Sequence, residues 1–270
     1  MVITDEELKS LTDAIQKRHG LDFSSYEPLS LKRRVTRALH VFSMESIHEL
    51  WVKILREHGF IYSFMDEISV GLTAMFRDPI LWRELRSLMR NGFFPERELS
   101  IWHAGCSTGE EVFTMGIVLK EAPCLMSYKA LATDISNQAI QTAVKGHYSL
   151  QKMSEYEDNY KGYNPYGNLK RHYQLAEDNM SMHHDLTRHV QYENHNLISG
   201  AFDRKFDIIF CRNVMIYFDN EAKRKLFERF HHSLNDGGLL IIGFYDAVLP
   251  LVDPTRYKVL DIEAKIFQKI

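Results

Sequence analysis

The sequence predicts an α/β protein in which a helical amino-terminal region precedes a parallel β-sheet covered by helices on both faces. Apolar residues recur at helical spacing up to about residue 75, beginning with Leu8, Leu11 and Ile15. From residue 99 onward, short apolar runs alternate with helical segments, the pattern of a doubly wound parallel sheet. No Gly/Ser-rich linker separates the two regions, so a boundary near residue 70 rests on the change of pattern.

Capping signals place the first helices. Thr4 is followed by three acids, which predicts that a helix begins there. Ser43 is the expected cap of the third helix, and Pro79 is expected in the first turn of a later one. The intervening helices are expected at about 29–42, 45–57 and 61–75.

Strands and helices then alternate. The Asn-Asp-Gly-Gly run at 235–238 predicts a turn before a buried strand, and the tail after residue 257 predicts a closing hairpin. The stretch 148–190 is rich in Tyr, His, Asn and Asp and lacks clean periodicity, and a small inserted subdomain is more plausible than a long structureless loop. The expected strands are 99–104, 128–133, 206–211 and 239–243, with helices at 111–120 and about 220–234.

Composition excludes several classes of function. The formal charge of -3 and apolar fraction of 45% favour an ordinary soluble domain and argue against nucleic-acid or anionic-membrane binding. No apolar run has the length of a membrane span, and the amino terminus carries acids where a signal peptide carries Lys or Arg. The cysteines show no metal-ligand spacing, so reduced thiols in a cytoplasmic protein and no metal site are expected. The cysteines are Cys106, Cys124 and Cys211.

A glycine-containing loop at Gly105–Gly109 joins an expected strand to an expected helix. Glycines let the backbone turn sharply and approach a ligand closely at the carboxyl edge of a sheet. The spacing matches neither the dinucleotide nor the P-loop pattern, which argues against phosphate chemistry and against a nicotinamide dehydrogenase. Glu110 and Glu111 open the next helix and suit a cationic ligand such as S-adenosylmethionine, while Asp134 is placed to bind ribose hydroxyls. The same features have structural explanations: acids favour a first helical turn, and an aspartate placed like Asp134 is more often a cap than a ligand.

Five motifs occur in a specific order along nearly the whole chain: LeuThrAlaMetPheArgAspPro (72–79), TrpHisAlaGlyCysSerThrGlyGluGlu (102–111), AlaThrAspIle (132–135), AsnLeu (196–197) and PheAspIleIlePheCysArgAsnValMetIleTyrPheAsp (206–219). Together they resemble the chemotaxis receptor methyltransferases, the CheR family. The resemblance implies a Rossmann-like doubly wound S-adenosylmethionine methyltransferase domain at 71–270, with an inserted antiparallel β-subdomain at about 163–195 and an all-helical domain at 1–70.

The resemblance also implies roles for individual residues. The product would be S-adenosylhomocysteine, the acceptor a receptor glutamate, and Tyr217 would lie beside the sulfonium methyl with Arg77 and Arg212 at the reaction centre. Without the resemblance, the structural explanations are preferred, with Tyr217 as a core residue and Asn196 as a turn former. The implied cofactor-binding residues are Thr73, Arg77, Ala104, Gly105, Glu111, Asp134, Asn196, Leu197, Arg212 and Asn213.

One helix carries a cluster of cations. Lys32, Arg33, Arg34 and Arg37 fall within about two helical turns. Such a run is usually a solvated face. The resemblance implies that it meets the acidic methylation region in the cytoplasmic helical domain of a chemoreceptor.

The chain departs from the family pattern at three places. Gly71 replaces a frequent Asn, and Gly243-Phe244-Tyr245-Asp246 replaces Gly-His-Ser-Glu, which raises the alternatives of another acidic acceptor or a non-catalytic cofactor-bound adaptor on receptor arrays. The loop at 174–179 lacks the glycine-rich insertion of members that bind a receptor's carboxyl-terminal peptide. No such peptide tether is therefore expected.

Overall fold

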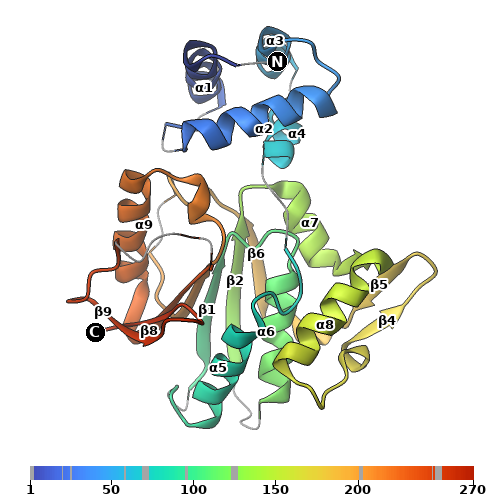
Figure 1. Cartoon of the computed structure of the whole chain (residues 1–270), viewed down its shortest axis with the longest axis vertical. Helices are drawn as coiled ribbons and strands as arrows, with labels where there is room; N and C mark the ends of the chain where they lie inside the picture. The colour runs from blue at the N-terminus through green and yellow to red at the C-terminus, as the bar shows by residue number, and fades with distance from the viewer. Residues whose placement is uncertain are drawn as a thin grey trace.

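The structure is a computed structural model of the chain. It describes residues 3–19, 21–24, 26–57, 59–68, 73–94, 97–122, 127–200, 203–244, 246 and 251–270. Figure 1 shows the first four helices grouped together above a layered domain whose strands run through its centre. None of the helices in these described ranges has the length and apolarity of a membrane span.

The helical part begins with a reciprocal cap. Thr4 Oγ1 accepts the Glu7 amide at 3.2 Å, and Glu7 Oε2 accepts the Thr4 amide at 2.9 Å. The third helix is capped by Ser46, which accepts the Glu49 amide at 3.2 Å, so the expected cap at Ser43 is wrong. Ser43 lies one turn earlier with a φ of 54°. The helices are α1 (Asp5–His19), α2 (Pro28–Val41), α3 (Ile47–Arg56) and α4 (Phe60–Ile68).

These helices bury one face each in a shared core. The first expected apolar positions, Leu8, Leu11 and Ile15, are all buried in it. Arg34 of α2 is buried as well, at 9% exposure. The helices therefore form a packed unit with its own hydrophobic core.

The main sheet has the predicted parallel centre. Its described strands lie in the order β6-β2-β1-β7-β8-β10-β9, parallel from β6 to β8 and antiparallel at β10 and β9, the expected hairpin. The Asn-Asp-Gly-Gly run lies inside β8 rather than before it, where Gly237 has a φ of 74° and the register on β7 shifts. The strands are β1 (Leu99–Ala104), β2 (Tyr128–Asp134), β6 (Val190–Asn194), β7 (Phe206–Cys211), β8 (Leu234–Ile242), β9 (Tyr257–Asp261) and β10 (Ile266–Lys269).

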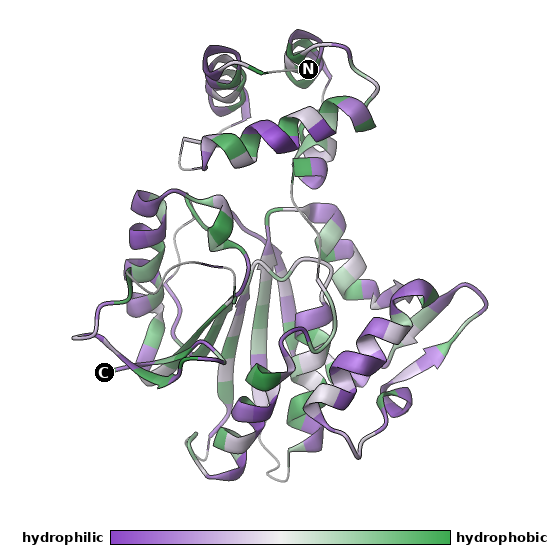
Figure 2. Ribbon diagram, viewed as in Figure 1, coloured by the Kyte–Doolittle hydropathy of each residue, from purple (hydrophilic) through white to green (hydrophobic). Residues whose placement is uncertain are grey.

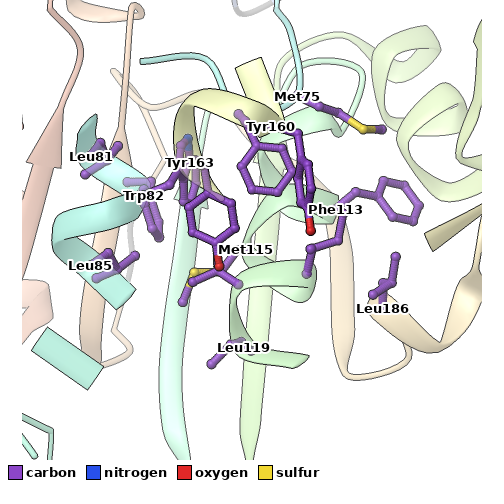
Figure 3. Close-up of a cluster of buried hydrophobic side chains, with 14 of the residues drawn as sticks. Met75, Leu81, Trp82, Leu85, Phe113, Met115, Leu119, Tyr160, Tyr163 and Leu186 are labelled. Atoms are coloured by element: carbon purple, nitrogen blue, oxygen red, sulfur yellow. The ribbon is translucent and has the colours of Figure 1, made fainter. Parts of the chain in front are cut away.

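Helices cover both faces of this sheet. Trp82 of α5 stacks on Phe210 of β7 with ring centroids 5.6 Å apart, and Tyr163 of α8 stacks on Phe76 at 4.8 Å. Figure 3 shows Trp82 and Tyr163 within a cluster of buried side chains. Figure 2 shows that the most hydrophilic residues lie mainly on the helices and loops around the sheet. The helices are α5 (Pro79–Arg90), α6 (Glu110–Glu121), α7 (Asn137–Lys145), α8 (Met153–Tyr163) and α9 (Asn220–Ser233).

The irregular stretch folds around a second, small antiparallel sheet. Its strand order is β3-β5-β4, so β3 joins it from upstream of residue 163, whereas β6 belongs to the main sheet. The elements are β3 (His147–Ser149), β4 (Tyr173–Leu175) and β5 (Asn179–Met182), with short 3-10 turns η1 (Leu150–Lys152), η2 (Leu169–His172), η3 (His184–Leu186) and η4 (Met215–Tyr217).

Candidate active site

A cavity of about 440 Å³ lies where the carboxyl ends of β1, β2 and β7 meet. This is the edge at which doubly wound sheets bind ligands. Tyr26, Arg34, Asp66 and Ile68 of the helical part complete its wall. Among the residues implied by the resemblance, its lining contains Thr73, Arg77, Gly105, Glu111, Asp134, Asn196, Leu197, Arg212, Asn213 and Tyr217.

Ala104 does not line this cavity. Its side chain is 2% exposed and packs in the core on the α9 side of the sheet. The strand end therefore supports the loop that follows it, and the lining begins at Gly105.

The loop after β1 is packed too closely for side chains at its glycines. Gly105 has a φ of 86°, and a Cβ there would lie 2.4 Å from Val214 Cγ2. Gly109 has a φ of 93°, and its Cβ would lie 2.7 Å from that of Ala143. Left-handed backbone and close approach both require glycine, so the motif brings two loops together at the cavity.

Asp134 fixes the same loop from the end of β2. Its carboxylate accepts the Ser107 amide at 2.8 Å and the Ser136 amide at 2.9 Å. Burial raises the pKa of Asp134, an effect that these backbone groups oppose and that nearby Asp66 adds to. Asp134 therefore combines a structural role with a position on the cavity wall.

Glu111 is held between a histidine and an arginine. Its Oε1 lies 2.8 Å from His103 Nδ1, and its Oε2 accepts Arg212 Nη1 at 3.1 Å. Burial tends to raise the pKa of Glu111, but the His103 hydrogen bond and the Arg212 charge outweigh burial and lower it. Arg212 also donates to the Arg77 carbonyl at 2.9 Å and to Asp78 at 2.8 Å. Glu111 is thus an oriented anion facing the cavity.

Glu110 points the other way. It is fully buried and accepts Tyr156 OH at 2.8 Å, Lys152 Nζ at 3.1 Å and Thr108 Oγ1 at 2.6 Å. The two consecutive acids therefore have different roles. Glu110 anchors α6 to the segment around α8, and Glu111 lines the cavity.

The helical part reaches Tyr217. The Arg34 guanidinium lies 3.6 Å from the centroid of the Tyr217 ring, within cation–π range. The Glu27 amide donates to the Tyr217 carbonyl at 3.0 Å, and Tyr26 pairs with Phe218 through a β-bridge. Burial raises the pKa of Tyr26 to about 12. Sequence reasoning missed Tyr26 as a lining residue and grouped Arg34 with exposed cations, because nothing local to α2 indicates which element it packs against.

The other three cations of α2 lie toward solvent. Arg33 is exposed, and Arg37 pairs with Glu67 at 2.8 Å while its side chain remains 64% exposed. Lys32 is more covered and pairs with Asp5 at 2.8 Å. Exposed ion pairs of this kind contribute little to stability, so another acidic group can replace their partners.

The loop after β6 forms the far wall of the cavity. Asn196 Oδ1 accepts the Ile198 amide at 2.9 Å, which closes a tight turn. Arg229 of α9 donates to the Leu197 carbonyl at 2.6 Å and the Gly200 carbonyl at 3.1 Å. Arg229 holds this loop without lining the cavity, and only the fold reveals it.

The acid of the Gly-Phe-Tyr-Asp departure anchors the loop after β7. Asp246 is 1% exposed, and its carboxylate accepts the amides of Asn213 at 2.6 Å, Gly243 at 2.9 Å and Ile216 at 3.0 Å. A Cβ at Gly243 would lie 2.4 Å from the Asn213 nitrogen. Gly243, which the family pattern shares, and the departing residue Asp246 therefore together hold the geometry of the Tyr217 loop.

The remaining departures lie elsewhere. Phe244 is 61% exposed, with Lys265 Nζ 5.7 Å from its ring centroid. Gly71 and Tyr245 lie outside the described residues.

Several polar atoms of the lining residues have no protein partner. Ser107 Oγ, Arg212 Nε and Asn213 Nδ2 are buried without a hydrogen bond. Buried polar groups normally have partners, which makes a polar ligand the simplest explanation. The cavity volume falls in the range of about 300–1,000 Å³ typical of small-molecule sites. Carboxylates at Asp66, Glu111 and Asp134 suit a ligand that carries positive charge and ribose hydroxyls.

The fold and this cavity define the class: a Rossmann-like S-adenosylmethionine-dependent methyltransferase. Comparison with known families gives the particular one. The family described as "CheR methyltransferase, SAM binding domain" matches residues 71–266, and "CheR methyltransferase, all-alpha domain" matches residues 6–69. The chain belongs to the CheR methyltransferase family.

Curated relatives match this chain over nearly the full length of both sequences. "Putative methyltransferase Cher3" of Pseudomonas putida is 31% identical over 98% of this chain and 97% of its own length. Proteins named "Chemotaxis protein methyltransferase" are 29% identical in Borreliella burgdorferi, over 95% of each chain, and 25% identical in Listeria monocytogenes, over 90% of each chain. Among solved structures, PKMT2 of Rickettsia typhi in complex with AdoHcy is 15% identical over 60% of this chain and 25% of that chain, with a TM-score of 0.36. The family assignment rests on the sequence matches.

Proposed function

We propose that this protein transfers a methyl group from S-adenosylmethionine to glutamate side chains in the cytoplasmic helical domain of a chemoreceptor, forming glutamate methyl esters. Family membership and the relatives' names support the reaction class. The observation that carries the proposal is the pair formed by Arg34 and Tyr217, in which a cation lies over the face of the phenol ring on the cavity wall. Such a pair suits an anionic acceptor held beside the cofactor.

The chain's own residues do little chemistry and much positioning. S-adenosylmethionine supplies a methyl group on a positively charged sulfur, which becomes a neutral thioether as the new ester bond forms. A glutamate carboxylate is already ionised at neutral pH, so the protein needs no general base. Tyr217 would orient the reacting groups, while Arg34 and Arg77 would hold the acceptor charge. Arg212 would act through Glu111 and Asp78, its two ion-pair partners. The rate then comes from alignment and exclusion of water.

The assay for this reaction uses radiolabelled S-adenosylmethionine and receptor-containing membranes. Esters should form that release volatile methanol in alkali. Tyr217→Phe should lower kcat roughly tenfold or more with less effect on cofactor affinity, because orientation acts in the transition state. Stable methylation would point to another acceptor, and no methylation with normal cofactor binding would favour the adaptor. Equal losses of turnover and affinity in Tyr217→Phe would contradict the role given to Tyr217.

For the receptor-contacting surface, we propose the exposed face of α2 formed by Lys32, Arg33 and Arg37, in a domain spanning residues 1–70. Charge complementarity would raise the encounter rate with an acidic receptor helix. Arg33→Glu should lower kcat/KM for the receptor several-fold at low salt and less at high salt, because ions screen exposed charges. Arg224→Glu on α9, also exposed, serves as the control. A loss independent of salt would contradict the electrostatic role.

The catalytic domain of this proposal spans residues 71–270 and acts in the cytoplasm without a peptide tether. The β4–β5 turn is short, with the Ala176 amide bonded to the Asn179 carbonyl at 2.8 Å, and β4 has three residues. Receptors with and without their last residues should therefore be methylated at equal rates. A marked loss on truncation would show a tether.

A further inference from the structure

We propose that His103 is a positioning residue that orients the Glu111 carboxylate toward the amino group of the bound cofactor. The inference rests on the proposed cofactor chemistry and extends it to a residue outside the cavity lining. His103 is the fifth residue of β1 and is 1% exposed. Its Nδ1 lies 2.8 Å from Glu111 Oε1.

The His103 ring has little freedom to move. It stacks on Phe210 of β7 with centroids 4.8 Å apart and planes 5° from parallel. The two residues are register partners on the neighbouring central strands β1 and β7, so strand pairing and stacking together hold the imidazole in place. A rigid donor is what a precisely aimed carboxylate requires.

The direction of the hydrogen bond follows from charge. Glu111 also accepts from Arg212 and has a lowered pKa, so it is an anion and can only accept. The His103 Nδ1 therefore carries a hydrogen and donates it. Each carboxylate oxygen has its own donor, which fixes the plane of the carboxylate as well as its place.

The ligand atoms that this carboxylate suits are cationic. The backbone carbonyls and amides of the cavity can form hydrogen bonds with neutral ligand groups. The oriented Glu111 carboxylate at the start of α6 instead favours an ammonium group, such as that of the cofactor's amino-acid end. Without His103, Glu111 would keep its Arg212 partner and rotate about that contact. Affinity for the amino-acid end would fall, and affinity for the nucleoside end would not.

Calorimetry with two ligands tests this division. S-adenosylhomocysteine carries the amino-acid end, and 5′-methylthioadenosine lacks it. His103→Leu removes the donor and should weaken S-adenosylhomocysteine roughly tenfold while leaving 5′-methylthioadenosine within about twofold, the size expected for one hydrogen bond to a charged group. His103→Asn, whose amide nitrogen can occupy the Nδ1 position, should restore most of the affinity.

A double variant separates a specific effect from general damage. In a Glu111→Gln background, His103→Leu should change S-adenosylhomocysteine affinity by less than about twofold, since coupled residues are non-additive. Equal weakening of both ligands, or full additivity with Glu111→Gln, would overturn the inference and show a merely structural histidine. Wild-type protein that binds neither ligand would overturn the proposed cofactor chemistry itself, whereas normal wild-type binding with an unaffected His103→Leu variant would overturn only the role of His103.

Discussion

The arginine that holds the loop after β6 can be tested by removing its charge. Arg229→Met keeps much of the side-chain volume but leaves the Leu197 and Gly200 carbonyls without the guanidinium that now reaches them at 2.6 and 3.1 Å. A hydrogen bond from a charged group contributes about 1.5–3 kcal/mol. Arg229 is partly exposed, so water can replace some of this. We therefore expect the free energy of unfolding to fall by about 1–3 kcal/mol in total.

The loss should also reach the ligand, because Asn196 and Leu197 of this loop line the cavity. If ordering the loop costs about 1.4 kcal/mol more of the binding free energy in the variant, S-adenosylhomocysteine should bind roughly tenfold more weakly by calorimetry. His195 provides an independent readout. Its pKa is lowered by burial and then by the Arg229 charge, so the variant should titrate at higher pH in NMR.

The matched control is Arg224→Met, an exposed arginine on the same helix. It should leave stability, affinity and the His195 titration unchanged. Affinity and a His195 pKa in Arg229→Met equal to those of the control would refute the reasoning, because the loop would then hold its shape without the guanidinium.

Two further variants probe the loops on the other side of the cavity. Gly105→Ala should lower the free energy of unfolding by about 2–4 kcal/mol, because it combines left-handed backbone strain with the Val214 clash. The control Gly92→Ala, where φ is 67° and the space is open, should lower it by only about 1–2 kcal/mol. Equal urea midpoints for the two variants would contradict the clash. Burial raises the pKa of Asp246 from its ordinary 3.8 to about 6. Between about pH 4 and 6 the Asp246 carboxyl is protonated in the folded protein but ionised in the unfolded chain. The stabilisation from the raised pKa is therefore complete below about pH 4 and is lost as pH rises through about 6, which lowers the free energy of unfolding by about 3 kcal/mol. Asp246→Asn does not titrate and should remove that part of the pH dependence in urea unfolding, whatever fixed cost its altered hydrogen bonds carry; identical pH profiles would contradict the assignment.

The sequence predicted the parallel centre of the fold well because its signals are local. The apolar runs at 99–104 and 206–211 became β1 and β7 with the same bounds. The turn predicted at the Asn-Asp-Gly-Gly run was wrong, because these residues lie inside β8, where the pairing with β7 shifts its register. That outcome depends on a neighbouring strand, which residue type alone does not reveal.

The candidate site likewise contains residues that the sequence identified and residues that only the fold reveals. The glycine loop and Asp134 were recognisable because they lie at the ends of predicted strands, whereas Arg212 and Asn213 were identified only through the resemblance to the family. Tyr26 and Arg229 were not, since their roles come from elements far away in the sequence. Glu110 and Glu111 illustrate the limit most clearly. These adjacent identical residues point in different directions from α6, and the packing of α8 on this helix decides which one meets the cavity.

The position of α2 places the helical part against the cavity wall. Arg34 lies on the Tyr217 ring and also donates to the Ile68 carbonyl, while Ser136 of the sheet domain donates to Asp66. These contacts join the two parts of the chain at the cavity rather than at a distant interface. A receptor helix docking on the exposed face of α2 would therefore lie one helix away from Tyr217, on the same rigid element that carries Arg34. Under the proposed function, acceptor docking and the geometry around Tyr217 would be coupled through a single helix, which would be a physical reason for one chain to combine a small helical domain with a methyltransferase fold.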